Sequence, residues 1–396
     1  MPFPSTGAIK LSDIKKSVYV SDSAYFLDKI STKSKENTGS AYSVRLVNSS
    51  YYGPSVNVRR SSDNATQDFY SDIDGNLGTE YLAKGTTFES WLGTDNGYVT
   101  KMYDQTGNGR HVSQSTNANQ PLIGPYHVLQ AISSAGRTAT RGAYGLFRMS
   151  NTYTGPTIKF RRSSDNAVSD FYANASGFLG TSINGTGTTF STWAGSTAIY
   201  VDTWYDQSGS GNHATQSTTA NQPVYNGTLK LLDFSTQYSF LNMGTTSGGP
   251  IPTGILNAPY TFVTRHGAVG STPGAGAIIA SGGNGAQNQL NGIGLFPNYG
   301  NYWYSNDLHN IATPVNGNTF IAKYDGTNRT GYVNNNMMVT AAGSGYTVAS
   351  GYQQYIGRDP RGTSTSFSGQ LYTLYIFNTA LSDSDRMACT ANPTDL

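Results

Sequence analysis

The sequence predicts an all-β protein in which a β-sandwich follows a duplicated β module. Charged residues make up 12% of the 396 residues, about half the usual share of roughly 25%. Glycine (46 residues) and tyrosine (28 residues) are abundant. Glycine tolerates the positive φ of tight turns and tyrosine fills the pleats of strands, whereas the strong helix formers glutamate and lysine are scarce. The composition therefore favours short strands joined by tight turns.

The net charge and the hydropathy argue against two classes of partner. The formal net charge is +2 and the sequence holds no stripe of Lys and Arg, so we expect no nucleic-acid partner. No apolar run reaches the length of a membrane-spanning helix, so we expect no membrane partner. A single cysteine, Cys389, excludes a disulfide within the chain, and the first residues lack the pattern of a secretory signal. These features favour synthesis in a reducing cytoplasm.

A tandem repeat dominates the sequence. Residues 42–123 align with residues 144–225 at a constant offset of 102 without a gap, and 39 of the 82 positions are identical. The shared motifs are RRSSDNA at 59–65 and 161–167, GTTF at 85–88 and 187–190, YDQ at 103–105 and 205–207, and ANQP at 118–121 and 220–223. An ungapped match of this length indicates a duplication, so the two copies are expected to share one structure.

Strand patterns continue after the second copy. They predict strands at Tyr260–Arg265, Gly276–Ala280, Gly292–Phe296, Thr319–Tyr324, Thr330–Asn334, Gln354–Gly357 and Gly369–Phe377. Asp325-Gly326 and Asn334-Asn335-Asn336 have the composition of hairpin turns. Short strands at this spacing predict a β-sandwich.

The chain is expected to divide into three parts. Residues 1–39 lie outside the repeat, hold six lysines and contain a helix-capping pair, Ser12-Asp13. They are either an anchoring segment that docks onto another protein and can be deleted without loss of the fold, or a solvated tail. Residues 40–143 should form a small β-domain whose last part, 124–141, is a linking strand and a loop. Residues 144–396 should form one sandwich, because the second repeat continues into the later strands without a linker.

Two stretches resemble known families. The duplicated unit, with RRSSDNA, GTTF and WYDQSGSGNHATQS at 204–217, resembles part of the catalytic domain of fungal-type α-L-arabinofuranosidase B. The same unit resembles repeats in structural proteins of phages and large DNA viruses, and TGAIKLSDI at 6–14 is similar to the start of some virion-associated proteins. The C-terminal stretch, with FIAKYDGTNRTGYVNN at 320–335 and YIGRDPRGTSTSFSGQLYTLYIFNTALSDSDR at 355–386, is similar to laminin-G/concanavalin-like lectin sandwiches. This similarity implies a concanavalin-like jelly roll.

The resemblance to the arabinofuranosidase implies a glutamate nucleophile, an aspartate acid/base and a disulfide between adjacent cysteines. No glutamate follows Glu89, no carboxylate lies between Phe234 and Asn306, and the adjacent cysteines are absent. A retaining glycosidase needs two carboxyl groups about 5–5.5 Å apart. We therefore expect no enzyme activity, and the remaining alternative is a rearranged pair drawn from Asp206, Asp307, Asp325 or Asp359.

Several motif residues favour turn chemistry over catalysis or metal binding. The aspartate of YDQ (Asp104 and Asp206) is expected to fix a chain reversal through an Asx turn, and the arginines of RRSSDNA to pair with Asp63 and Asp165 rather than clamp an anion. His111 and His213 have no second ligand at metal-binding spacing. The faint calcium-loop pattern Asp72-x-Asp74-Gly75 is lost in the second copy. We expect neither a metal ion nor another cofactor.

Sugar binding needs aromatic faces and polar groups for hydroxyls. The candidate ligand-binding residues are Tyr302, Trp303, Tyr304, Asn306, Asp307 and His309, together with Trp204 and Asp206. The alternative is that these aromatic residues fill the sandwich.

These observations predict a non-enzymatic structural, decoration or fibre protein of a virion, made in the host cytoplasm. Its lectin-like sandwich would bind surface glycans and its N-terminal segment other virion proteins, with homo-oligomerisation left open. The alternatives are a glycoside hydrolase or its inactive relative, and a bacterial surface adhesion module.

Overall fold

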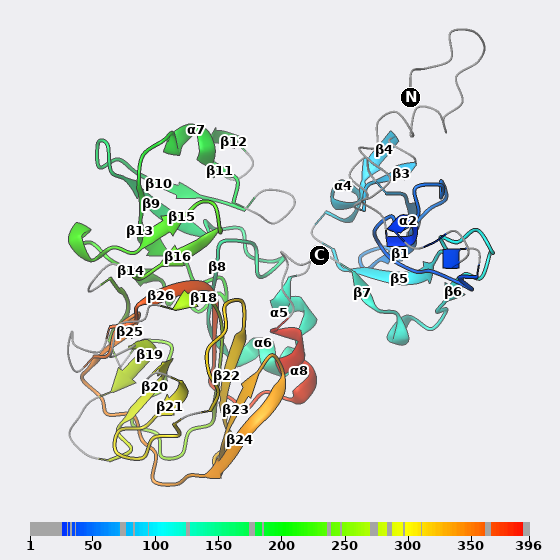
Figure 1. The fold of residues 1–396 in the computed structure, drawn as a ribbon. Coiled ribbons are helices and arrows are strands. Elements are labelled where there is room, and N and C mark those ends of the chain that lie inside the picture. The colour runs from blue at the N-terminus through cyan, green and yellow to red at the C-terminus, as the bar shows by residue number, and fades with distance from the viewer. Residues whose placement is uncertain are drawn as a thin grey trace. The chain divides into compact units, whose positions relative to one another are not determined.

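A computed structural model describes the chain in two units, Met1–Tyr126 and His127–Leu396 (Figure 1). The described residues are 26–29, 31, 34–35, 37–71, 77–81, 84–93, 95–123, 127–173, 179–183, 186–235, 239–245, 248–269, 276–282, 287–295, 298–309, 311–360 and 366–390. Ser12-Asp13 and Asp72-x-Asp74-Gly75 lie outside them. In the described part of the chain, none of the helices has the length and hydrophobicity of a membrane span.

The N-terminal unit is a small antiparallel sheet with its own core. Its strands are β1 (Val56–Arg60), β2 (Thr66–Phe69), β5 (Gly97–Met102), β6 (Val112–Ser113) and β7 (Leu122–Ile123), in which β1 lies between β2 and β5, and β6 and β7 pair with β5. A hairpin of β3 (Thr79–Tyr81) and β4 (Lys84–Thr87) leads into helix α4 (Phe88–Leu92). The buried core consists of Val56, Val58, Phe69, Phe88, Leu92 and Val99.

The second repeat forms the same elements. They are β9 (Ile158–Arg162), β10 (Val168–Phe171), β11 (Thr181–Ile183), β12 (Thr186–Thr189), α7 (Phe190–Ala194), β13 (Ile199–Trp204), β14 (Ala214–Thr215) and β15 (Val224–Asn226). Each begins 102 residues after its counterpart in the first copy. The pairings also repeat, with β9 between β10 and β13. The duplication predicted from the sequence is therefore a duplication of structure.

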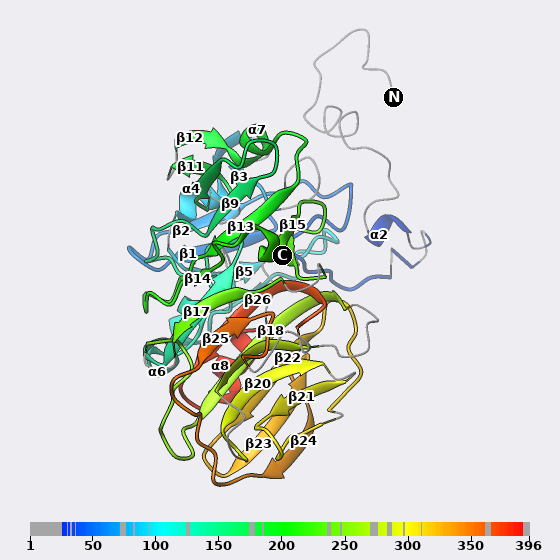
Figure 2. The ribbon, with the colours of Figure 1, turned by 90° about the vertical axis from the view of Figure 1, so that its left-hand side faces the viewer.

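The later strands build a two-layered β-sandwich (Figure 2). One sheet is centred on β26 (Gly369–Phe377), which pairs on one side with β8 (Thr140–Gly145) and β16 (Leu231–Asp233) and on the other with β18 (Tyr260–Val269), followed by β22 (Thr319–Tyr324), β23 (Asn328–Val333) and β24 (Asn336–Ala342). The other sheet runs in the order β21 (Tyr299–Tyr302), β20 (Leu290–Leu295), β19 (Ala277–Gly282), β25 (Gln353–Ile356) and β17 (Leu241–Thr245). The predicted all-β sandwich is confirmed.

The second repeat is continuous with both sheets of the sandwich. Strand β14 pairs with β17, and β15 pairs with β16, which in turn pairs with β26. A single hydrophobic core joins residues of the repeat to residues of the later strands, among them Tyr144, Phe160, Trp204, Ile293, Phe320 and Ile376. The repeat therefore does not pack as a separate body within this unit.

The strands predicted between residues 260 and 377 correspond to β18, β19, β20, β22, β23, β25 and β26. Four further strands, β16, β17, β21 and β24, were not predicted. Both hairpin turns form. Asn334 and Asn335 have φ of 48° and 68° between β23 and β24, and the carboxylate of Asp325 accepts the backbone N–H groups of Thr327 and Asn328.

The linker differs from its prediction. Instead of a strand and a loop, residues 128–138 form two short helices, α5 (Val128–Ala131) and α6 (Ser134–Thr138), before β8. Ser133 caps α6, because its Oγ accepts the N–H of Gly136 and donates to Asp385 at 2.7 Å, in helix α8 (Asp383–Ala388). Residues 127–143 consequently pack with the C-terminal unit and not with the first repeat.

Part of the predicted anchoring segment belongs to the N-terminal unit. In helix α2 (Phe26–Lys29), Leu27 is 2% exposed and its N–H donates to the carbonyl of Val47. The Asp28 carboxylate accepts the N–H of Ser49 and pairs with Lys35. The pKa of the Asp28 carboxyl lies below its ordinary value. Burial raises this pKa, but the hydrogen bonds from Lys35 and Ser49 lower it by more than burial raises it. These contacts of Leu27, Asp28 and Lys35 argue against the expectation that all of residues 1–39 can be removed without loss of the fold.

We predict that Leu27→Ala lowers the free energy of unfolding of the N-terminal unit by about 2–5 kcal/mol, because it removes a buried side chain and leaves a cavity. Chemical denaturation measures the change. Val112→Ala, at a position 47% exposed in the same unit, is the matched control and should have little effect. Equal effects of the two substitutions would show that α2 is not part of the core of this unit.

Candidate functional site

The two tryptophans proposed to stack on a sugar are buried. Trp303 is 0% exposed, and its ring stacks on Tyr346 with 4.5 Å between centroids. The guanidinium of Arg329 lies 4.0 Å from the centroid of the same ring. Trp204 is also 0% exposed and packs against Tyr144. Neither ring has a face open to a ligand, so both belong to the aromatic core.

The other residues of the 302–309 segment form a bend held by internal contacts. Tyr302 is buried, Tyr304 has a φ of 62°, and the Asp307 carboxylate accepts the N–H of Trp303 at 2.7 Å. The carbonyl of Asn306 accepts a hydrogen bond from Arg329, and exposed His309 lies beside Tyr302 and Asp307. Strands β14, β17, β25, β19 and β20 separate this segment from β13, so the structure does not bring it together with Trp204 and Asp206.

Asp104 and Asp206 fix chain reversals, as predicted. Asp206 is 0% exposed, and its carboxylate accepts backbone N–H groups from Ala143, Ser208 and Asn212 at 2.8–3.1 Å. Asp104 accepts the equivalent bonds from Ala41, Thr106 and Arg110. Burial raises the pKa of Asp104, but these hydrogen bonds together lower it below its ordinary value. A carboxylate engaged in this way is a structural acceptor.

The two adjacent arginines of each RRSSDNA motif also contact residues of their own repeat. Arg60 pairs with Asp63, and Arg162 with Asp165, each at 2.6 Å. The preceding arginines, Arg59 and Arg161, donate to Gln120 and Gln222. These contacts confirm the internal pairing predicted for the motif.

The two repeat histidines have structural contacts as well. The Nδ1 of His213 accepts the N–H of Asp206 at 3.1 Å, and His111 accepts that of Asp104 at the same distance. Among the described residues there is no group of three or more His, Cys, Asp or Glu side chains that could hold a metal ion.

A group of three tyrosines, one aspartate and one histidine occurs once in each repeat, in which the tyrosines and the aspartate are half-buried and the histidine is exposed. This tyrosine cluster consists of Tyr153, Asp170, Tyr172, Tyr205 and His213 in the second repeat, and of Tyr51, Asp68, Tyr70, Tyr103 and His111 in the first. The Tyr205 hydroxyl donates to Asp170 at 2.7 Å, and the Tyr103 hydroxyl to Asp68 at 2.8 Å. The histidine ring packs edge-to-face on Tyr205 or Tyr103, with centroids 5.0 and 4.9 Å apart. All five residue types are identical in the two copies.

Burial and nearby carboxylates raise the pKa of Tyr205 and Tyr51. Burial, the hydrogen bond to Asp170 and the charge of that carboxylate raise the pKa of Tyr205 far above its ordinary value. Burial, with the charges of Asp104 and Asp68 and the nearby Tyr70, raises the pKa of Tyr51 to about 12. The cluster therefore presents hydroxyl groups next to a carboxylate acceptor at physiological pH.

A glycine positions one tyrosine of each cluster. The Tyr153 ring folds back over Gly155, and its hydroxyl donates to the carbonyl of Pro156 at 2.7 Å. A Cβ at residue 155 would lie 2.7 Å from the Tyr153 hydroxyl oxygen, and one at Gly53 would lie 2.5 Å from that of Tyr51. The close approach explains why both copies retain Gly-Pro two residues after the tyrosine.

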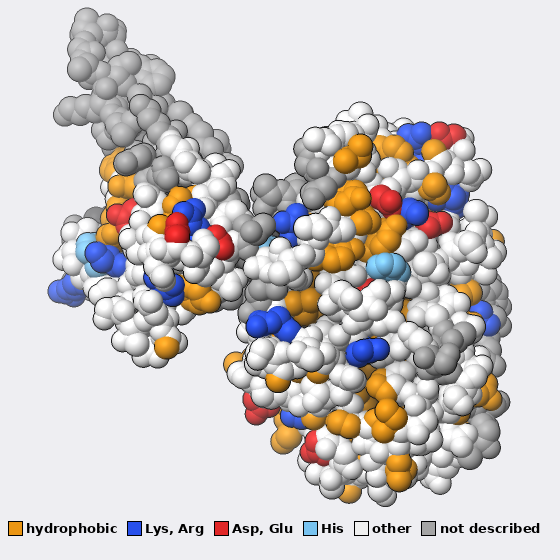
Figure 3. Space-filling view, turned by 180° about the vertical axis from the view of Figure 1, so that it is seen from behind, with side chains coloured by type: hydrophobic (Ala, Val, Ile, Leu, Met, Phe, Trp, Pro, Cys, Tyr) orange, Lys and Arg blue, Asp and Glu red, His pale blue; other side chains and the backbone are white. Residues whose placement is uncertain are grey.

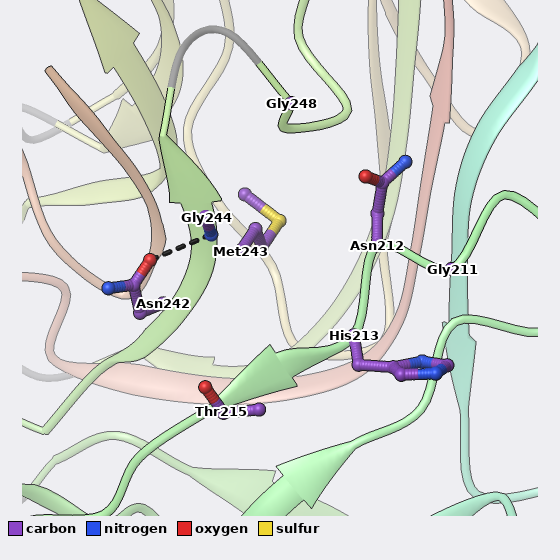
Figure 4. Close-up of a pocket in the computed structure, with 8 residues that line it drawn as sticks. All are labelled: Gly211, Asn212, His213, Thr215, Asn242, Met243, Gly244 and Gly248. Atoms are coloured by element: carbon purple, nitrogen blue, oxygen red, sulfur yellow. Dashed lines mark hydrogen bonds between the residues drawn. The ribbon is translucent and has the colours of Figure 1, made fainter. Parts of the chain in front are cut away.

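The cluster of the second repeat adjoins an open hollow of about 380 Å³. One wall holds Gly211, Asn212, His213 and Thr215, at and before β14, and the other holds Asn242, Met243, Gly244 and Gly248, in and after β17. Figure 4 shows Asn212 and Met243 on opposite sides of the hollow. The second wall has no counterpart in the first repeat, because that repeat ends before an equivalent of β17. His213 belongs to both the hollow and the tyrosine cluster.

Sequence analysis did not identify the tyrosine cluster. Its residues come from four separate places in each repeat, and only the fold brings them together. The available signal was the repeat itself, because all five cluster positions are identical in the two copies, three of them within YDQ and the motif DFY at 68–70 and 170–172.

No protein-family model matches the chain, and no curated protein sequence matches it. Among solved structures, the chain is similar to a mutant of a GH54 α-L-arabinofuranosidase soaked with 4-nitrophenyl α-L-arabinofuranoside (13% identity, 68% of this chain, TM-score 0.49), and it spans 64% of that protein's length. It is also similar to the Trypanosoma rangeli sialidase in complex with the inhibitor DANA (16% identity, 49% of this chain and 31% of that chain, TM-score 0.35). A third similar structure is domain 4 of AbnA, a GH43 extracellular arabinanase from Geobacillus stearothermophilus, in complex with arabinotriose (13% identity, 60% of this chain and 100% of that chain, TM-score 0.32). Likeness this remote indicates neither an activity nor a ligand.

We predict that the RRSSDNA ion pairs make stability depend on pH below about 4. Hydrogen bonds from Arg60 and Arg162 lower the pKa of Asp63 and Asp165 from 3.8 to about 2. A carboxylate with a lowered pKa stabilises the fold above its unfolded pKa, and this stabilisation is lost as the pH falls toward 2. The melting temperature of the native protein should therefore exceed that of the double variant Asp63→Asn/Asp165→Asn at pH 6, and the difference should vanish near pH 2. A difference independent of pH would contradict the role of the charge.

Proposed function

We propose that the chain is a non-enzymatic carbohydrate-binding protein, and that the tyrosine cluster of the second repeat with its adjoining hollow takes a neutral glycan. The observation that carries the proposal is the group of half-buried tyrosine and aspartate side chains with an exposed histidine, identical in both repeats, at positions outside the hydrophobic core clusters. Tyrosine rings offer apolar faces for the C–H side of a sugar, and phenol and carboxylate groups pair with its hydroxyls.

The charge near the cluster supports a neutral ligand. Asp170 has Lys159 3.8 Å away, so the carboxylate is balanced by a cation. On the face of the C-terminal unit in Figure 3, Lys, Arg and Asp side chains are scattered among uncharged residues and form no continuous patch of one sign. A polyanionic ligand would require a cluster of cations.

The arrangement of the carboxylates supports the absence of catalysis. Asp206, Asp307 and Asp325 each accept a backbone N–H group within a turn. Asp359 is 2% exposed. A glycosidase needs one carboxyl with a free oxygen facing the anomeric carbon and a second one opposite it. These four candidates for a rearranged pair are used by the fold.

Affinity electrophoresis against arabinan, arabinoxylan, galactan and mannan tests the proposal. At least one of these neutral polysaccharides should retard the protein, and Asp170→Asn should weaken binding about tenfold, since a hydrogen bond to a charged group contributes about 1.5–3 kcal/mol. Asp165→Asn, which removes the same charge five residues earlier, is the matched control and should bind normally, and melting temperatures show whether each variant folds. No retardation by any of the four, or equal loss in both variants, would refute the proposed site.

The same preparation should release no product from aryl arabinofuranosides or related glycosides. Turnover that Asp206→Asn or Asp307→Asn abolishes would favour the glycoside-hydrolase alternative.

We also propose that the chain is a structural or decoration protein of a virion, as the resemblance of the repeat and of TGAIKLSDI implies. Residues 1–25 lie before the helix that packs on the N-terminal unit and are the proposed anchor. Deleting them should leave the melting temperature and glycan binding unchanged and abolish incorporation into particles, measured by mass spectrometry of purified virions. Normal incorporation of the truncated chain would refute the anchor, and display on a bacterial surface would favour the adhesion alternative.

A further inference from the structure

We infer that the chain is bivalent: each repeat carries its own glycan site, and the ligand is a polysaccharide whose repeating units occupy both. This inference rests on the proposed function and extends it from one site to two. It is carried by the geometry of the first tyrosine cluster and by the pattern of differences between the repeats.

The two clusters have the same internal geometry. The tyrosine–aspartate hydrogen bond measures 2.8 Å in the first repeat and 2.7 Å in the second. The bond from Tyr51 to the Pro54 carbonyl is 2.8 Å, and that from Tyr153 to Pro156 is 2.7 Å. A ligand therefore meets the same tyrosine, aspartate and histidine groups in both clusters, although Asp68 has Asn57 beside it where Asp170 has Lys159.

Core positions have diverged more than the cluster has. Val58 in the first repeat corresponds to Phe160 in the second, Leu92 to Ala194, and Met102 to Trp204. Phe160, Ala194 and Trp204 are buried, as are Val58 and Leu92. Half-exposed positions tolerate substitution more readily than core positions. Half of the six core positions of the first repeat differ in the second repeat, whereas all five cluster positions are identical, as a shared ligand would require.

The first cluster does not depend on the sandwich. The N-terminal unit has its own buried core, and the contacts of Asp68 come from that unit, from Asn57 at 2.7 Å and from Tyr103. Because the wall formed by β17 is missing there, the first site offers fewer contacts than the second. We therefore expect it to bind the same sugar more weakly.

Two sites on one chain favour polymers over short fragments. Once one site is occupied by a polysaccharide, binding at the other becomes intramolecular, and avidity exceeds single-site affinity by about 10²–10⁴-fold when both sites can be reached. A fragment too short to reach both sites gains nothing.

The experiment compares the native chain with Asp68→Asn, Asp170→Asn and the double variant. Titration calorimetry uses hexasaccharide fragments of whichever of arabinan, arabinoxylan, galactan or mannan retards the protein, and affinity electrophoresis uses the intact polysaccharide. The native chain should bind two hexasaccharides and each single variant one. Each single variant should also lose at least tenfold in affinity for the polysaccharide, with the larger loss for Asp170→Asn.

The outcomes separate the two proposals. One hexasaccharide per native chain, with Asp68→Asn indistinguishable from native, overturns bivalency and leaves the proposed function intact. Two hexasaccharides without a gain for the polysaccharide also overturns it, because the sites then act separately. Normal binding by the folded double variant, or binding by none of the proteins, would overturn the proposed function itself. Asp63→Asn and Asp165→Asn are the matched charge controls for the two repeats.

Discussion

Two adjacent buried side chains, Asp206 and Gln207, tie the beginning of the second repeat to its end. Asp206 accepts the N–H of Ala143, and Gln207 accepts the N–H of Met149 while donating to the carbonyls of Gly145 and Phe147. These hydrogen bonds satisfy backbone N–H and C=O groups of residues 143–149 that are not paired with a neighbouring strand. The first part of this segment, residues 143–145, belongs to β8, which pairs with β26 in the larger sheet. Two side chains of the YDQ motif thus contribute to the attachment of the repeat to the sandwich, beside the β14–β17 and β15–β16 pairings.

Asp104 and Gln105 make the equivalent hydrogen bonds in the first repeat. Asp104 accepts the N–H of Ala41, and Gln105 contacts the backbone of Ser43, Arg45 and Val47. Residues 38–48 nevertheless form no strand, because the described part of the N-terminal unit offers no counterpart of β26. The same side-chain hydrogen bonds therefore accompany a strand, β8, in the second copy and an irregular segment in the first. The difference is that β26 offers β8 a strand edge to pair with.

This dependence on context explains what could be predicted from the sequence. Elements with a local cause were found: the duplication, the strands with a period-two pattern, and the turns whose Asp or Asn side chains supply their own hydrogen bonds. Short strands such as β16 and β17 were missed because their pairing, not their sequence, defines them. For Trp303 the sequence left two alternatives, a ligand-binding residue or a core residue, and the structure shows the second, because Tyr346 and Arg329 enclose it from distant parts of the chain. The tyrosine cluster was missed for the same reason, since Tyr153, Asp170 and Tyr205 meet only after β9, β10 and β13 have paired.

The position of β26 has a consequence for the order of folding. The central strand of the larger sheet is also the last strand among the described residues, and it pairs with β8, more than 220 residues earlier. Contacts of such long sequence separation slow folding, and domains generally fold from the N-terminus during synthesis. The N-terminal unit can complete its sheet while the ribosome is still translating the rest. The C-terminal unit cannot close its larger sheet until residues 369–377 have been translated, so β8 and β18 each keep one edge unpaired until then.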